Sequence, residues 1–519
     1  MKSVLAARTN LAFWGVAILA VLASAPRVHA ETLSDVLSEA YRSNPTLLSQ
    51  RAQLRAVDES YAAALSELGP TVQVQVTANY QQTRLGKATR NTERLSTALL
   101  PDFLEQNSGQ GEIVVTQPLY TGGHASADLD VAAAKVRAAR EALKATEANI
   151  MLSVIQAYSS VVEDGHALEI RRLNLETLEH QVVETKARLN AGEVTQTDVS
   201  QAEAQLASEN ALYAQAQGQM GIDRAAFFAV VGRIPGSLDD PPDLQGLPDT
   251  IDEAFSFAET ESPDLKAAYF TEQESRAQIR ATRSTYAGTV SASVQYGSTG
   301  SLTPFDPRNL QRAAVGIVTY SQPLYTSGLD RAQIRQSLEA NASDRFNIET
   351  ARRSVVQNVA NGWTQLATAT RTIAAQEAQI KAAEISFKGM RLEYRAGDRS
   401  TLDVLVAEET LRDAELALAA ARRDRLVAEA TLLRYMGRLS PEALVGTLRP
   451  YQPSDHFTRS VHTVPPWTAS LFHLDRVGQH QDIVVKPEGS NSNREKSDAG
   501  PSSVTDLTLP ERPIEGPRL

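Results

Sequence analysis

QPLYTGG at residues 117–123 recurs as QPLYTSG at residues 322–328, an offset of 205 residues. Two further pairs of segments keep this offset: residues 190–199 match 395–404 around an Ala-Gly step and an Asp-Val step, and residues 231–234 match 436–439 around Gly-Arg. Three matches at one offset are not expected by chance, and such self-similarity indicates duplicated structural units. The sequence therefore predicts a fold built from two similar halves.

Upstream of these matches the offset is larger. Residues 44–47 correspond to 262–265, and 71–72 to 289–290, both at 218 residues. The first half therefore has 13 extra residues, and because insertions usually lie in exposed loops we expect a surface loop within 82–111. We place the first structural repeat at residues 31–249 and the second at 250–445.

Each half contains a segment with the alternation of a β-strand. In the first half, polar residues alternate with an apolar set of Val72, Val74, Val76, Ala78 and Tyr80. In the second half, the corresponding apolar set is Val290, Ala292, Val294 and Tyr296. Period-two alternation predicts strands with one apolar and one polar face. Return strands are expected near residues 112–117 and 313–322, which makes four strands in the chain.

Long helices are predicted after each QPLYT turn. No proline occurs between Gly123 and Pro235 or between Gly328 and Pro441, and these stretches are rich in good helix formers. Apolar residues recur every seven positions, which predicts left-handed coiled-coil packing; they are Leu168, Leu175, Val182 and Leu189, and their counterparts Ile373, Ile380, Phe387 and Tyr394. A helix over 125–190 would be about 100 Å long. Glycine followed by Thr or Ser and an acid, at 192–198 and 397–403, predicts that each long helix turns back as a hairpin.

Composition and the N-terminus limit the classes of protein. The chain has 519 residues, no cysteine, and 51 Lys+Arg against 62 Asp+Glu, for a net charge of −11. This balance disfavours a nucleic-acid partner. A charged start, an apolar run from Leu11 to Ala23 and a small-residue ending at Ala30 predict a signal peptide over residues 1–30. No later stretch is apolar enough for a membrane-spanning helix. The chain is therefore expected to be exported.

Four strands with an apolar face raise a physical problem. Open edges in hydrocarbon leave backbone groups unpaired at several kcal/mol each, and spanning barrels need about eight strands or more. Either several chains combine their strands into one barrel, or the strands lie outside a membrane. The first reading predicts a homo-oligomeric conduit lined by polar residues. The second predicts a secreted or periplasmic coiled-coil spacer or adhesin with a small β cap, and periodicity leaves both open.

Together these motifs resemble the TolC-type outer-membrane efflux and secretion channels. The resemblance covers residues 32–445 and rests on the opening at 32–45, the paired QPLYT turns and the hairpin motifs. It implies a mainly helical homotrimer whose twelve-stranded transmembrane β-barrel, four strands per chain, continues into a helical coiled-coil barrel in the periplasm. It further implies docking onto a periplasmic adaptor protein and an inner-membrane ABC or RND-type transporter, for export of drugs or unfolded proteins. The absence of cysteine matches the unlipidated members of the family.

The same resemblance implies a periplasmic gate at the hairpin tips. Thr197 and Asp198 on the first hairpin, and Tyr394 and Arg399 on the second, match the link residues of the family. Asp403 matches one acid of its cation-selective constriction. An Arg–carboxylate bond is charge-assisted, and a tyrosine hydroxyl can donate to the same acid. The local alternatives remain open: both aspartates are also suited to cap a helix, and Tyr394 to fill a heptad position.

The sequence departs from the family pattern at the constriction, and its composition changes after residue 445. The second constriction acid of the family corresponds to Val406, and Glu408 points about 140° away from Asp403 around a helix. The proline-rich segment 446–519 is predicted to be disordered, while docking of Trp467 to Phe472 onto the helical tube is left open by the sequence. It contains His456, His462, His473 and His480 at spacings that fit no metal motif. No nucleotide, hydrolase or zinc-protease motif occurs, so neither an enzyme nor a cofactor is expected.

Overall fold

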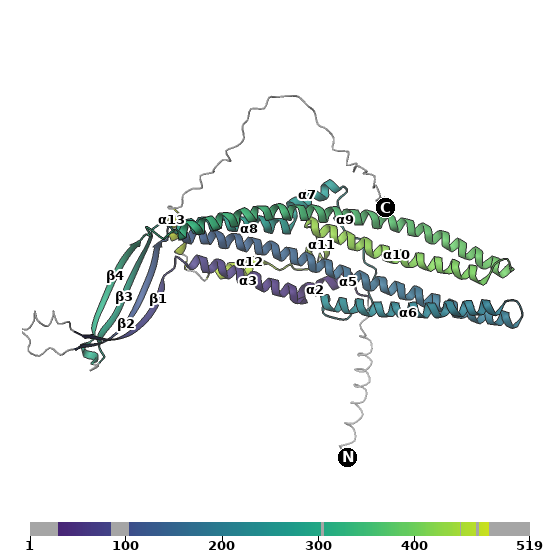
Figure 1. The fold of residues 1–519 in the computed structure, drawn as a ribbon, viewed down its shortest axis with the longest axis horizontal. Helices are drawn as coiled ribbons and strands as arrows, with labels where there is room; N and C mark the ends of the chain where they lie inside the picture. The colour runs from purple at the N-terminus through teal and green to yellow at the C-terminus, as the bar shows by residue number, and fades with distance from the viewer. Residues whose placement is uncertain are drawn as a thin grey trace, which may run out of the picture. The chain divides into compact units, whose positions relative to one another are not determined.

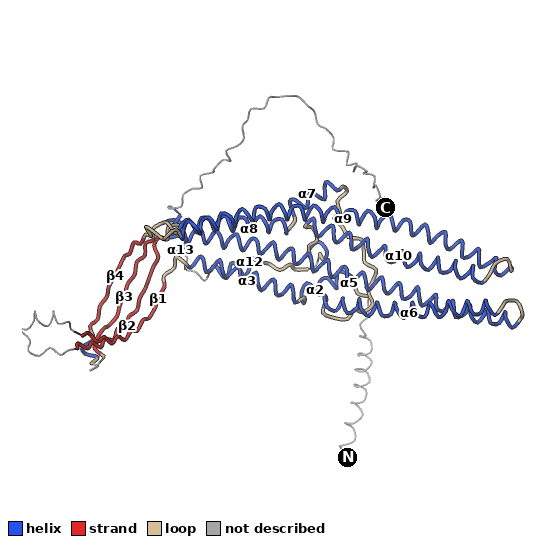
Figure 2. Tube along the Cα trace, in the orientation of Figure 1, coloured by secondary structure: helices blue, strands red, loops and turns tan. Residues whose placement is uncertain are grey.

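The computed structural model describes residues 30–84, 103–302, 306–446, 448–462, 465 and 467–476. Figures 1 and 2 show long helices and one small sheet. The elements, in chain order, are α2 (Leu33–Ser43), α3 (Pro45–Ser66), β1 (Thr71–Arg84), β2 (Phe103–Tyr120), α5 (His124–Asn190), α6 (Gln196–Val231), α7 (Ile251–Glu261), α8 (Pro263–Ser284), β3 (Thr289–Ser301), η1 (Pro307–Asn309), β4 (Gln311–Ser321), α9 (Leu329–Ala396), α10 (Thr401–Met436), α11 (Pro441–Leu444), α12 (Pro453–Val461) and α13 (Thr468–Arg476). The series α2 to α6 recurs as α7 to α10, so the predicted duplication is confirmed.

The four strands form one antiparallel sheet in the order β1-β2-β3-β4. Both return strands were predicted, but β2 is longer than expected and runs from Phe103 to Tyr120. The predicted loop within 82–111 is correspondingly shorter, because β1 continues to Arg84. Residues 85–102 between these strands, and residues 1–29 of the predicted signal peptide, lie outside the described residues.

The strand register aligns the apolar side chains on one face of the sheet. Directly opposed residues of antiparallel strands share a face. One such row contains Val72, Val115, Val294 and Gly316, and the next contains Val74, Ile113, Tyr296 and Ala314. Within the single chain this face is open to solvent, with Val74 75% and Val318 71% exposed. The period-two pattern therefore describes a real, uncovered apolar surface.

Turns with left-handed backbone lead from the sheet into the two longest helices. Gly123, with φ of 85°, precedes the 67-residue α5, and Gly328, with φ of 86°, precedes the 68-residue α9. Gly122 is also left-handed, and a Cβ there would lie 2.5 Å from the Ala287 side chain. Its counterpart Ser327 has φ of 54°, so the second repeat adopts the same turn without that glycine. Among the described residues, no helix combines the length and apolar character needed to cross a membrane.

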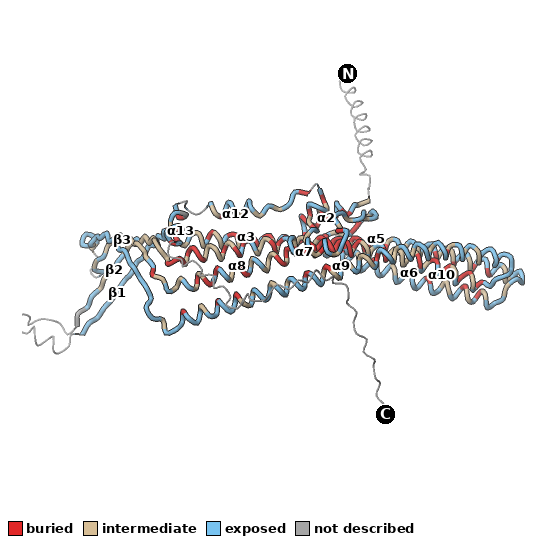
Figure 3. Tube along the Cα trace, turned by 90° about the horizontal axis from the view of Figure 1, so that it is seen from above, coloured by how far each residue is buried: buried red, intermediate tan, exposed pale blue. Residues whose placement is uncertain are grey.

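The long helices pair as predicted, α5 with α6 and α9 with α10. The main apolar core lies where α2, α5, α6, α7, α9 and α10 meet, and Figure 3 shows buried residues concentrated there. Its largest fully buried side chains include Tyr158, Phe227, Met151 and Met436. The large buried side chains are concentrated in this region, and most residues at the hairpin tips are exposed.

The prediction of disorder from residue 446 is wrong for part of that segment. Helices α12 and α13 pack against α3 and α5. Phe457 lies 5.0 Å from Tyr61 between ring centroids, and Phe472 is buried against Leu68 and Ala125. A few aromatic anchors therefore order a segment whose average composition is that of a disordered chain. Residues 477–519 lie outside the described residues.

Candidate functional site

The first hairpin tip ends in a capping box. The Thr195 backbone N–H and Oγ1–H donate to Asp198 Oδ2 at 2.8 and 2.7 Å, and the Asp198 N–H contacts Thr195 Oγ1 at 3.4 Å. These bonds satisfy donors at the start of α6. The hydrogen bond from the Thr195 hydroxyl is the main cause of a lowered Asp198 pKa. Thr197 is exposed in the first turn of the same helix.

The second tip repeats this arrangement. The backbone N–H and the side-chain hydroxyl of Ser400 donate to Asp403 Oδ2 at 3.0 and 2.9 Å. The backbone bond from Ser400 is the main cause of a lowered Asp403 pKa. Both predicted aspartates are thus helix-capping residues within one chain, as the local alternative proposed. Because each is still ionised and accessible at a tip, capping leaves its charge available to other groups.

Tyr394 is the predicted gate residue that connects the two hairpins within one chain. Its side chain is 7% exposed, and the Arg188 guanidinium from α5 lies over its ring, 4.7 Å from the centroid. The hydroxyl of Thr401 lies 3.5 Å from the Tyr394 hydroxyl. Arg188 also pairs with Glu193 at 3.2 Å. Sequence reasoning missed Arg188, although it directly precedes Leu189, the first-repeat counterpart of Tyr394.

Arg399 contacts its own hairpin. Its Nε donates to Glu393 at 2.8 Å, and both side chains are about half exposed. The described part of the chain therefore places Arg399 with Glu393, and not with Thr197 or Asp198. The four predicted link residues are not brought together within one chain.

The two positions near Asp403 behave differently. Val406, at the position of the second constriction acid implied by the family resemblance, is 52% exposed. An exposed apolar side chain therefore stands at that position. Glu408 is 4% exposed, and burial raises the pKa of its carboxyl. Glu408 therefore faces the helix packing and does not replace the missing acid.

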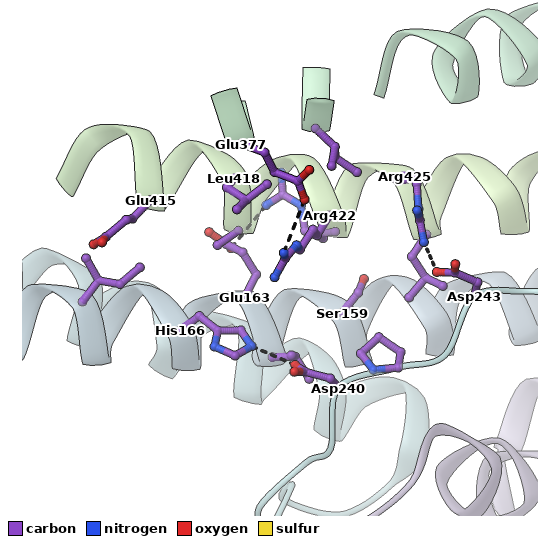
Figure 4. Close-up of a pocket in the computed structure, with 17 residues that line it drawn as sticks. Ser159, Glu163, His166, Asp240, Asp243, Glu377, Glu415, Leu418, Arg422 and Arg425 are labelled. Atoms are coloured by element: carbon purple, nitrogen blue, oxygen red, sulfur yellow. Dashed lines mark hydrogen bonds and ion pairs between the residues drawn. The ribbon is translucent and has the colours of Figure 1, made fainter. Parts of the chain in front are cut away.

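A cleft of about 460 Å³ lies between α5, α9, α10 and the segment that follows α6. Figure 4 shows polar and charged side chains around it; the ion pairs are Arg422–Glu377, Arg423–Glu163 and Arg425–Asp243, and His166 Nε2 lies 2.8 Å from Asp240. The three arginine pairs connect α10 to α9, α5 and the segment after α6, so the cleft lies at a junction between the hairpins. It contains none of the predicted gate residues.

A buried acid lies on α5 beside this cleft. Asp164 is 5% exposed, and burial, followed by the hydrogen bond and charge of Asp223, raises its pKa to about 7. Like charges in a poorly solvated site favour the protonated form of one carboxyl. The α5–α6 pair therefore contains a group that titrates near neutral pH.

Comparison with known proteins identifies the family. Residues 36–233 and 255–438 match the family described as "Outer membrane efflux protein". The chain belongs to this outer membrane efflux protein family. It is 30% identical over 428 residues to the outer membrane efflux protein BepC of Brucella suis, covering 82% of this chain and 90% of BepC. It is 27% identical over 433 residues to the outer membrane protein TolC of Vibrio cholerae, covering 82% and 94%.

The solved structure of the outer membrane protein VceC from Vibrio cholerae has the same fold. Its TM-score is 0.65 at 20% identity, over 78% of this chain and 96% of VceC. Membership of the efflux family confirms the predicted resemblance, fold class, outer-membrane location and role as an exit duct. The alternative of a secreted spacer or adhesin is therefore wrong. The matched residues include both hairpin tips, so the tips belong to the family fold.

Among the described residues, Glu67, His124 and Asp128 form one group whose possible metal-ligand atoms all lie within 4.8 Å of one another. No local spacing predicted this group, because Glu67 is distant in sequence from the other two. The group lies away from the hairpin tips, where α3 ends and α5 begins.

Proposed function

We propose that three copies of this chain form an outer-membrane duct that receives cargo from an inner-membrane transporter. The observation that supports this most strongly is the exposed apolar face shared by β1 to β4. The strands have 14, 18, 13 and 11 residues, and about 9–11 residues suffice for one strand to cross a bilayer. Four strands are too few to close a barrel, whereas twelve from three chains are enough.

The polar face of the sheet supports a water-filled lumen. Gln73 on β1 lies in a row with Val114 on β2 and Gln295 on β3, and Gln75 lies opposite Glu112 on β2, so this face is the more polar of the two. On closure of the barrel, the apolar rows would contact lipid and these polar rows would line the interior. The same trimer would bring three pairs of hairpins together around one axis, below the membrane.

We further propose that the hairpin tips form the closed end of the duct. Exposed ion pairs contribute about 0–1 kcal/mol, so Arg399 can exchange Glu393 for the Thr197 and Asp198 region of a neighbouring chain at little cost. The Tyr394–Arg188 contact would hold the two hairpins of one chain together. Asp403, repeated three times, would place a ring of negative charge at the opening and favour cations.

The partners proposed for this duct are a periplasmic adaptor and an inner-membrane transporter of the ABC or RND type. Weak links at the tips suit a gate that opens when such partners dock. Cargo would be drugs or unfolded proteins, selected by the transporter. The chain itself would serve in transport without catalysis, without a nucleic-acid partner and in contact with outer-membrane lipid.

The experiment has two readouts. Protein extracted in detergent should migrate as a trimer without boiling and as a monomer after boiling, whereas an unboiled monomer would contradict the assembly. In planar bilayers, Tyr394→Leu, which removes the ring beneath Arg188, and Arg399→Ser should each raise single-channel conductance. Arg172→Ser is the matched control, because Arg172 forms exposed pairs with Glu169 and Glu176 in the middle of α5. Unchanged conductance in both tip variants would remove these residues from the gate.

A further inference from the structure

Three metal-ligating side chains converge at the junction between the sheet and the helices. His124 is the first residue of α5, Asp128 lies one turn later, and Glu67 follows the last residue of α3. One ligand atom from each lies within 4.8 Å of the others. Histidine and aspartate four residues apart share a helix face, and the end of α3 brings the third side chain to that face.

The distance between the first two ligands fits a shared cation. His124 Nε2 lies 3.4 Å from Asp128 Oδ2. Two ligands that each bind a tetrahedral Zn²⁺ at 2.0–2.1 Å are about 3.4 Å apart. The Glu67 carboxylate lies within 4.8 Å of the other two ligand atoms, and rotation of this side chain at the end of α3 can bring it to the spacing that a shared ion requires. Both His124 and Asp128 are only partly buried, so an ion can reach them.

The orientation of His124 is set from outside the group. Its Nδ1 lies 3.2 Å from the Ala281 carbonyl oxygen and 3.2 Å from Ser284 Oγ, both near the end of α8. A carbonyl oxygen can only accept, so Nδ1 donates to it, and this bond directs Nε2 towards Asp128, where it can bind a metal ion once it carries no proton. Metal-binding histidines are commonly held by a hydrogen bond of this kind from their second nitrogen.

The local charge also favours a cation. The group brings two carboxyl side chains, Glu67 and Asp128, to a single imidazole. The positive end of the α5 dipole is already matched by Asp475, whose carboxylate accepts from Thr121, Gly123 and Ser126 N–H groups. The group therefore has two acidic side chains and only one imidazole to balance them, which favours a bound cation.

We propose that Glu67, His124 and Asp128 bind a divalent transition-metal cation of the Zn²⁺ class. One imidazole and two carboxylates favour Zn²⁺ over Mg²⁺ and Ca²⁺, which select oxygen ligands alone. Three protein ligands leave a fourth position for water. The ion would tie the end of α3 to the start of α5, and through His124 to α8, beside the turns that lead into the strands. It would be a structural ion that stabilises this junction, at a site separate from the gate.

The experiment uses the full chain, purified in detergent, treated with a chelator and dialysed against Zn²⁺ alone. One high-affinity Zn²⁺ per chain is expected. His124→Ala should abolish it, and Asp128→Asn, which keeps the shape of the side chain, should weaken binding at least tenfold. Bound Zn²⁺ should resist a large excess of Mg²⁺. Trimer migration without boiling verifies that each variant is folded.

His456→Ala is the matched control. His456 also lies between two acids, but its Nδ1 faces Asp58 at 3.3 Å and its Nε2 faces Glu59 at 3.6 Å, so no single nitrogen shares an ion with both. The control should bind Zn²⁺ as the wild type does. Absence of binding in the wild type, equal binding in Asp128→Asn and wild type, or displacement by Mg²⁺ would each overturn the proposal.

Discussion

The start of α5 depends on a side chain from the C-terminal helix α13, and Asp475→Asn tests this dependence. Asp475 is fully buried. Its Oδ1 accepts from the Thr121 N–H at 2.7 Å, the Thr121 hydroxyl at 2.9 Å and the Gly123 N–H at 3.2 Å. Its Oδ2 accepts from the Ser126 N–H at 3.2 Å. Because Gly123 at the N-cap has no side chain, Asp475 supplies the cap from more than 340 residues away in sequence.

The magnitude follows from these four bonds. Asparagine can keep one oxygen on Thr121 and Gly123, but it turns an NH₂ group towards the Ser126 N–H, which removes one bond. The remaining bonds lose their charge, and charge-assisted bonds are roughly twice as strong as neutral ones. One lost bond to a charged group costs about 1.5–3 kcal/mol. Loss of the carboxylate from the helix dipole costs up to about 2 kcal/mol in a buried site. We therefore expect Asp475→Asn to weaken the docking of α13 onto the start of α5 by about 3 kcal/mol.

Native-state hydrogen exchange measures this loss locally. A change of about 3 kcal/mol corresponds to roughly a hundredfold faster exchange, because 1.4 kcal/mol is tenfold. The acceleration should be confined to residues near 121–126 and to α13. Asp455→Asn on the exposed first turn of α12 is the control and should leave exchange unchanged. Exchange within twofold of wild type in Asp475→Asn would refute the capping role.

Three further predictions concern the helical hairpins. Burial and the neighbouring Asp223 raise the pKa of Asp164 to about 7 in the folded chain. The folded state therefore holds more protons than the unfolded state between the ordinary pKa of an aspartate and pH 7, and stability falls as the pH rises through this window. Asp164→Asn should flatten the decrease in thermal midpoint between pH 5 and pH 8, and an unchanged decrease would contradict the assignment. Asp403→Asn should lower cation preference in planar bilayers, with no effect expected if Asp403 does not line the opening. A double-mutant cycle of Arg188→Gln and Tyr394→Leu should give a coupling energy of about 1 kcal/mol from thermal or chemical unfolding; additive effects would show that their contact contributes nothing.

Features that depend on neighbours in sequence were predictable. Alternation in Val72, Val74 and Val76 indicated β1, because period two reflects a strand with two different faces. The Thr195–Asp198 and Ser400–Asp403 spacings indicated where α6 and α10 begin, because a capping box requires residues three apart. The constant offset between the two repeats allowed an element recognised in one half to predict its counterpart in the other half. These signals also located the hairpin tips where the candidate gate lies.

Features that depend on distant segments were not predictable. Nothing local to the proline-rich segment showed that Phe457 and Phe472 find partners on α3 and α5, so α12 and α13 were missed.

The same limit applied to Arg188 over Tyr394, to Asp475 at the start of α5 and to Glu67 beside His124. The chain sequence encodes the period, caps and duplication through short-range backbone preferences. Apolar burial brings separate elements together, and only then do side chains from those elements meet. The spacing of residues within one element does not reveal which residue of another element will contact them, because such a contact depends on the packing of both.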